Sequence, residues 1–110
     1  VGLGNLMYLT SDGLILKRKT HPLALDLARR ADSALPGLEV GEQVGIAYTD
    51  AAVATKRGLI ALTLDALLPP TKVGDMHWHQ MSDTTDHIDP QSLARAHDYT
   101  WQLLQEVDRA

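Results

Sequence analysis

The side chains best able to do chemistry in this 110-residue chain gather in one stretch near its C-terminal end. Residues 69–88 lack helical or strand periodicity, which predicts a long loop. Loops longer than about 12–15 residues are often functional, and ligands in open α/β sheets bind beyond the carboxyl ends of strands. We therefore expect the site in or beside this loop, among these residues: Asp75, His77, Trp78, His79, Asp83, Asp86, His87 and Asp89.

Two of these histidines have a spacing that suits a metal ion. His77 and His79 are two residues apart, so in an extended segment both side chains point to the same side. Two imidazole nitrogens and a carboxylate can bind one transition metal. However, a single His-x-His is a weak motif, and the spacing alone favours ordinary polar loop residues, one of them packing on Trp78. A small metal-binding module that uses His77, His79 and a nearby Asp is an alternative.

The other polar residues have simpler interpretations. We expect His87 to be solvated or to cap the next helix, His97 to be half-buried on the last helix, and His21 to stand at the start of a helix without a functional role. Side chains at residues 83–86 can hydrogen-bond nearby backbone groups and so tighten the loop. Trp78 is a large aromatic residue, and such side chains more often contribute to packing within the protein than to ligand binding.

These residues need a scaffold, and the rest of the chain predicts one of the α/β class. Short apolar runs bounded by turn residues predict strands over 3–10, 43–48 and 59–64. The 59–64 run is almost continuously apolar, which is typical of a central strand covered on both faces. Helices are predicted between the strands and at the end, so the alternation indicates crossover connections.

Capping signals mark where the three helices begin. Thr20 precedes His21-Pro22 and offers a capping hydroxyl for a helix that ends at Pro36-Gly37. Thr49 or Asp50 can cap a short helix over 51–54. Asp89-Pro90 begins the last helix, whose predicted buried stripe comprises Leu93, Ala96, Thr100, Leu103, Leu104 and Val107.

Composition bounds the class of protein. The length fits one domain, and 45% hydrophobic residues fit a folded chain. The absence of cysteine excludes disulfide scaffolds and thiol catalysis. A net charge of −4 gives no electrostatic reason to bind nucleic acid or an anionic membrane. No apolar run approaches the ~20 residues of a membrane span. We expect neither nucleic acid nor membrane as a partner.

The loop resembles a known family signature. Residues 77–89 look like the C-terminal signature of M28-type zinc metallopeptidases, which reads aromatic-His-Thr, two variable residues, Asp-Thr, and Ile-Asp or Val-Asp at the start of the last helix. Upstream, Tyr48-Thr49-Asp50-Ala51 is similar to the family's Ser/Thr-Asp segment, and residues 58–64 are similar to its Gly-Ile-Pro-Ala-Leu strand. The two blocks occur in the family's order and spacing.

The resemblance implies a fold and a set of site residues. The family has a three-layer α/β/α fold, of which this chain would carry about three strands, crossover helices and a long C-terminal helix. Five side chains hold two zinc ions, and a Glu acts as general base. His79 maps onto a zinc ligand, and Trp78 occupies the place of a Tyr thought to steady the tetrahedral intermediate. Asp83 and Thr84 would support the loop. Ala51 stands where many members have His.

The resemblance also implies that the chemistry is shared with other residues. The family's remaining ligands, in its His-x-Asp and Glu-Glu motifs, have no match here and would fall before Val1. We therefore expect residues 1–110 to form one α/β unit, the C-terminal segment of a zinc-dependent exopeptidase that cleaves peptides with metal-activated water. A catalytic zinc needs about three protein ligands, so this chain alone is expected to be inactive and not to bind zinc tightly.

Two further expectations follow. The alternative function is a non-enzymatic peptidase-like module that binds a protein, which the Trp78 departure favours. A piece of a larger sheet would also leave an edge strand unpaired and an apolar face poorly covered. We therefore expect the isolated chain to self-associate.

Overall fold

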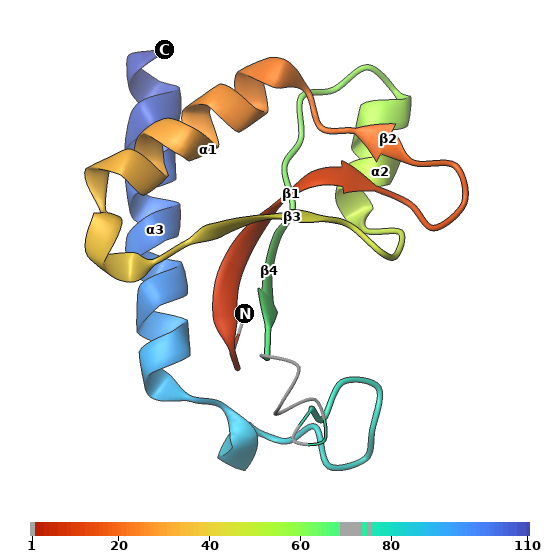
Figure 1. Ribbon diagram of the computed structural model, residues 1–110, viewed down its shortest axis with the longest axis vertical. Coiled ribbons are helices and arrows are strands. Elements are labelled where there is room, and N and C mark those ends of the chain that lie inside the picture. The colour runs from red at the N-terminus through yellow and green to blue at the C-terminus, as the bar shows by residue number, and fades with distance from the viewer. Residues whose placement is uncertain (1, 69–73, 75) are drawn as a thin grey trace.

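The computed structural model describes residues 2–68, 74 and 76–110 and shows a mixed α/β architecture (Figure 1). This confirms the predicted class. The elements in chain order are β1 (Asn5–Asp12), β2 (Arg18–Lys19), α1 (Pro22–Ala34), β3 (Gly41–Val44), α2 (Asp50–Lys56), β4 (Leu64–Leu67) and α3 (Pro90–Arg109), with short 3-10 turns at Pro36–Leu38 and Thr85–His87. No helix in the described part of the chain is long and apolar enough to cross a bilayer.

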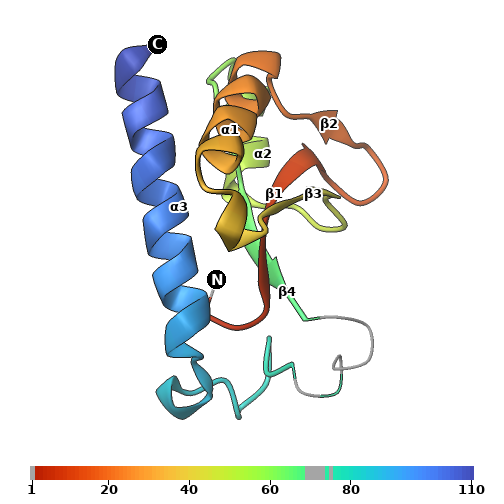
Figure 2. The same cartoon turned by 60° about the vertical axis from the view of Figure 1, so that its left-hand side comes forward.

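Strand β1 is the centre of the sheet. It pairs in parallel with β3, with Met7 opposite Gly41, and antiparallel with β2 and β4, with Tyr8 opposite Leu64. Helix α1 makes the crossover between the parallel strands β1 and β3. Both α1 and α3 lie on the same side of the sheet (Figure 2). The sheet is therefore mixed and is organised around one buried strand.

Two predicted strands were misplaced. Residues 59–63 form no strand and Leu59 and Ile60 are exposed, whereas β4 begins only at Leu64 and its residues are half-buried. Within the described residues β4 pairs with β1 alone, so the prediction of a central strand over 59–64 is wrong. Strand β3 likewise ends at Val44 instead of reaching residue 48. An apolar run indicates side chains whose burial is favourable. Which of these residues form a strand depends on where a neighbouring strand is available for backbone hydrogen bonding.

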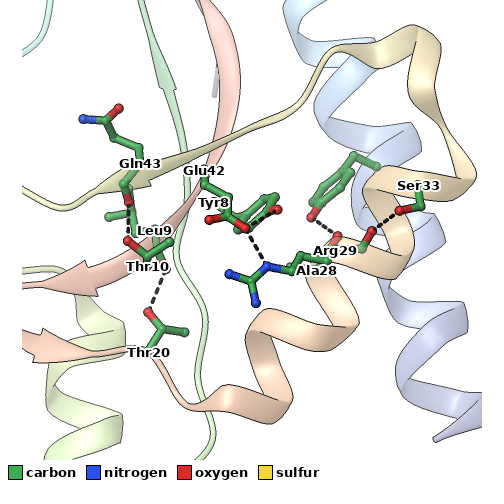
Figure 3. Close-up of polar contacts among 10 residues, drawn as sticks. Tyr8, Leu9, Thr10, Thr20, Ala28, Arg29, Ser33, Glu42 and Gln43 are labelled. Carbon is green, nitrogen blue, oxygen red and sulfur yellow. Dashed lines mark hydrogen bonds and ion pairs between the residues drawn. The ribbon is translucent and has the colours of Figure 1, made fainter.

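The core lies between β1, α1 and α3, where two tyrosines dominate. The rings of Tyr8 and Tyr99 are parallel, with centroids 6.3 Å apart. The Tyr99 hydroxyl donates to the Ala28 carbonyl at 2.9 Å, and the Tyr8 hydroxyl donates to Glu42 Oε1 at 3.1 Å. Arg29 Nε donates to the same Glu42 oxygen at 2.6 Å (Figure 3). Burial, followed by the hydrogen bond to Glu42, raises the pKa of Tyr8 to about 12.

The buried face of α3 differs from the predicted stripe. Ser92, Ala96 and Tyr99 are its buried residues. Three predicted members of the stripe are exposed instead: Leu93, Leu104 and Val107. The Tyr99 ring and the small side chains of α1 fix how α3 is rotated, so part of its apolar arc faces outward. Periodicity located the helix but not its rotation.

The helix starts were only partly predicted. Asp89 caps α3 as expected, since its carboxylate accepts the Gln91 N–H at 2.9 Å. Helix α1 is capped by His21, whose Nδ1 accepts the Leu23 N–H at 3.1 Å. Thr20, the predicted cap, donates its hydroxyl to the Leu9 carbonyl at 2.7 Å (Figure 3). His97 is exposed beside Asp98 and not half-buried as predicted.

Candidate active-site cleft

A cleft of about 830 Å³ is lined by segments from both ends of the sheet, since Val44 pairs with Ser11 at one end of β1 and Leu67 pairs with Asn5 at the other. The end of β3 and the segment after it, residues 43–50, form one part of its wall, and residues 63–68 of the β4 segment form another. The long loop supplies the remaining side, including Trp78, His79 and Asp83. The structure therefore brings the predicted site loop together with the Tyr48-Thr49-Asp50 segment, which lies about 30 residues earlier in the chain.

The long loop is held in shape by two histidines and a serine. The rings of His77 and His87 stack with centroids 3.8 Å apart and an interplanar angle of 8°. His77 Nδ1 lies 2.8 Å from the Ser82 hydroxyl, and His87 Nδ1 donates to the Ser82 carbonyl at 2.6 Å. His87 thus closes the loop on itself. His87 is exposed, as predicted from sequence, and it also makes this loop contact.

His79 occupies a special position in the loop backbone. Its φ is 59°, in the left-handed region, and the His77 carbonyl accepts the Gln80 N–H at 2.9 Å, which closes a turn around residues 78–79. The assumption of an extended segment, which placed His77 and His79 on one side, is therefore wrong. Non-glycine residues seldom adopt this conformation, and the His79 ring packs on Trp78 whereas the His77 ring stacks on His87.

His79 and Trp78 are both presented to solvent at the cleft. Their rings lie 4.1 Å apart at an angle of 51°, so His79 is the histidine that packs on Trp78. The Trp78 side chain is 63% exposed. Within the described residues, the His79 ring makes no hydrogen bond. An exposed imidazole without a competing partner is available to a ligand.

Asp83 and Thr84 lie in the tight turns that follow. The Asp83 N–H donates to the Gln80 carbonyl at 3.0 Å, and the Thr84 N–H donates to the Ser82 carbonyl at 2.9 Å. The Thr84 hydroxyl lies 3.4 Å from His87 Nδ1. The Asp83 side chain lines the cleft. The end of the loop is tied down separately, because the Asp89 N–H donates to the Gly2 carbonyl at 2.8 Å.

The opposite wall contains a polar cluster that the sequence did not reveal. Asp12 is only 6% exposed, and its carboxylate accepts the Thr49 N–H at 3.0 Å and the Thr49 hydroxyl. The Thr49 oxygen lies 2.6 Å from the Thr63 hydroxyl. The Thr49 hydroxyl thus connects its own wall segment, residues 43–50, to Asp12 at the end of β1 and to Thr63 in the other wall segment. A charged residue that ends an apolar strand run was the available signal for this cluster.

The electrostatics of the cleft are one-sided. Its charged lining residues are Asp50, Asp65 and Asp83, and no Lys or Arg is found among the described lining residues. A cleft lined by one sign of charge concentrates counter-charged groups. The cleft is therefore suited to ligands that carry a cationic group.

The described residues do not by themselves fit a catalytic zinc. In the described ranges no three His, Asp or Glu side chains come close enough to hold a metal ion, whereas such a zinc needs about three protein ligands. The three-ligand module of His77, His79 and an Asp is not formed by residues within these ranges. Asp75, another candidate, lies outside the described residues. His79 alone offers a single open ligand position.

Comparison with known families identifies the class of protein. The model of peptidase family M28 matches residues 14–104, which is most of the chain. The chain belongs to peptidase family M28, so its general function is of the peptidase type, within the hydrolases. The family is generally zinc-dependent. Neither the comparison with curated proteins nor that with solved structures found a match.

Proposed function

We propose that this chain forms the C-terminal part of the catalytic domain of a zinc-dependent exopeptidase that acts on the amino-terminal ends of peptides. The observation that carries the proposal is the position of His79, an exposed imidazole on the wall of the cleft within a segment matched by the M28 family. The carboxylates of the cleft support recognition of a peptide ammonium group. The two helices on one side of the sheet would form one layer of a three-layer domain.

The proposal assigns one metal ligand to this chain. His79 would bind zinc through its ring, and the other ligands of the two zinc ions would come from outside the described residues, because these hold no three-ligand group. Trp78 would contact the substrate, since its exposed indole lies next to His79 and its N–H can donate a hydrogen bond. Asp83 and Thr84 would support the loop that presents His79. Residues 1–110 alone would be inactive.

A second function is favoured by a separate observation. Ile46, Tyr48 and Trp78 are large apolar side chains that are exposed at the cleft. A surface of this kind also suits a protein partner. In this alternative the chain is a non-enzymatic, peptidase-like binding module, and His79 has no metal to bind.

The experiment that separates the two functions replaces His79→Ala in the full protein that contains this chain. The proposal predicts loss of bound zinc by metal analysis and a fall in aminopeptidase turnover of at least about 100-fold, because a metal ligand is removed. His97→Ala is the matched control, since His97 is exposed on α3 and is not a lining residue of the cleft. Unchanged zinc content and turnover in the His79 variant would contradict the proposal and would favour the alternative function as a non-enzymatic binding module.

A further inference from the structure

The hairpin that joins β1 to β2 ends in an apolar tip that projects from the molecule. Figures 1 and 2 both show this loop extending beyond the sheet. The tip consists of Leu14, Ile15 and Leu16, whose side chains are 63%, 88% and 78% exposed. Three consecutive aliphatic side chains all face water here, although single exposed hydrophobic residues are the usual case on protein surfaces.

The backbone around the tip keeps these side chains exposed. The Gly13 N–H donates to the Ala47 carbonyl at 2.9 Å, and Lys17 Nζ donates to the Gly45 carbonyl at 2.9 Å. Gly13 has a φ of +105°, and a Cβ there would lie 2.4 Å from the Leu16 carbonyl oxygen. The turn therefore requires glycine, and both ends of the loop are fixed to the neighbouring segment. The aliphatic side chains cannot fold back onto the sheet without breaking these contacts.

The tip is followed at once by three cations. Lys17, Arg18 and Lys19 are exposed, and the ion pairs formed within the described ranges lie elsewhere, on α1, β3 and α3. Asp12 is the only acidic residue from Asn5 to Lys19, and its carboxylate is buried against Thr49. The hairpin is therefore locally basic, although the whole chain carries a net charge of −4.

Cations on a short edge strand have an ordinary role, which is to prevent pairing with another chain. That role explains Arg18 and Lys19 but not the exposed aliphatic tip. A projecting tip also suits insertion between lipid headgroups better than docking on a flat protein surface. Aliphatic side chains beside a cluster of cations are the combination that binds anionic membranes peripherally.

We propose that the β1–β2 hairpin is a peripheral membrane-binding element for anionic phospholipid surfaces. Leu14, Ile15 and Leu16 enter the headgroup region, while Arg18 and Lys19 contact anionic headgroups and Lys17 holds the loop to the body of the protein. This inference does not depend on the peptidase function. It differs from the expectation of no membrane partner, which rested on the net charge and on the lack of an apolar run long enough to span a membrane.

The test is co-sedimentation of the purified chain with vesicles. Binding is expected to vesicles that contain phosphatidylserine, to be weak with phosphatidylcholine alone, and to fall at high salt. The combined change Leu14→Ser, Ile15→Ser and Leu16→Ser should abolish binding. The change Arg18→Gln with Lys19→Gln should weaken it roughly 25-fold, since each cation near an anionic surface contributes about five-fold.

Matched controls change the same residue types elsewhere. Arg30→Gln with Arg109→Gln removes two cations from α1 and α3, and Leu93→Ser with Leu104→Ser and Val107→Ser removes three exposed aliphatic residues from α3. Both should leave vesicle binding unchanged. The proposal is overturned if anionic vesicles do not bind the chain, or if controls and hairpin variants behave alike. It is also overturned if the serine variant abolishes only self-association without lipid, which would make a second copy the partner of the tip.

Discussion

The Thr49 hydroxyl donates a hydrogen bond to the Asp12 carboxylate and does not cap α2, the helix that begins after Thr49. Thr49 stands at the N-cap of α2, yet its side chain makes no capping hydrogen bond. The same hydroxyl also contacts Thr63, so it links two segments that line the cleft to the end of β1. A capping interaction typically contributes ~1 kcal/mol, and here the side chain makes a contact across the fold instead.

Removal of the Thr49 hydroxyl should destabilise the protein. Among the residues that the structure describes, Thr49→Val leaves the buried Asp12 carboxylate with the Thr49 N–H as its one donor, and an incompletely satisfied buried group costs about 1–3 kcal/mol. Urea unfolding should show this loss, and hydrogen exchange should show faster exchange of the amides in residues 47–52. Thr49→Ser should restore both.

The matched control for this prediction is Thr20→Val. It removes one hydroxyl that donates to the Leu9 carbonyl at 2.7 Å, and Thr20 itself is not among the residues that line the cleft. We expect a loss of about 1 kcal/mol with no effect on exchange in residues 47–52. If the two valine variants accelerated exchange in the same amides, the link between Asp12 and the cleft wall would be refuted.

Tyr99 should be the most sensitive side chain of the core. It is fully buried against Tyr8, and loss of a buried aromatic side chain costs about 3–5 kcal/mol. Tyr99→Ala should lower the free energy of unfolding by that amount, whereas Tyr99→Phe should cost about 1 kcal/mol through the lost hydrogen bond to Ala28. Tyr48→Ala, at an exposed position, should change stability by less than about 0.5 kcal/mol. Equal effects at Tyr99 and Tyr48 would contradict the assignment of the core.

The Asp89 cap should make the stability of the protein depend on pH in the acidic range. Hydrogen bonds from the Gln91 N–H and the Ser92 hydroxyl lower the pKa of Asp89 below its ordinary value of 3.8. When folding lowers the pKa of a carboxyl group, the ionised group stabilises the folded state at pH above its unfolded-state pKa. This stabilisation is lost as the pH falls through the folded-state pKa.

Asp89→Ala should therefore reduce the urea midpoint near neutral pH, and the difference from wild type should narrow below about pH 3.8. Asp108→Ala at the other end of α3 is the control, and it should not reduce the neutral-pH midpoint. A difference for Asp89→Ala that is constant from neutral to acidic pH would show that the cap does not act through its charge.

The isolated chain should self-associate through the open edge of β3. Within the described residues β3 pairs only with β1, and exposed strand edges pair readily with other chains. Val44 is exposed on this strand, so Val44→Lys should shift the chain toward monomer in sedimentation equilibrium. Val53→Lys places the same charge at an exposed position on α2 and should leave association unchanged. A wild-type chain that is monomeric at every concentration would count against this edge.

Several features could be predicted from the sequence because they depend on neighbours along the chain. The α/β class and the helices α1 and α3 follow from periodicity, and the Asp89 cap needs a partner only two residues away. The M28 resemblance was likewise visible in local motifs, and the match over residues 14–104 confirms it. For the same reason, the sequence indicated which loop contains His79 and Trp78, and the structure places both at the cleft.

The tertiary structure decided what depends on distant partners. Asp12 and Thr49 are 37 residues apart, and Tyr99 bonds a carbonyl 71 residues away, so no local pattern specifies either contact. The left-handed backbone at His79 and the stacking of His77 on His87 arise from closure of the loop. The extended segment that would have placed His77 and His79 on the same side is therefore not formed. The run Lys17-Arg18-Lys19 is visible in the sequence, but only the structure shows that it is exposed on a hairpin and that Asp12 is buried. Interactions between residues close in sequence determine which helices form, whereas packing between distant residues determines which elements pair and how they are oriented.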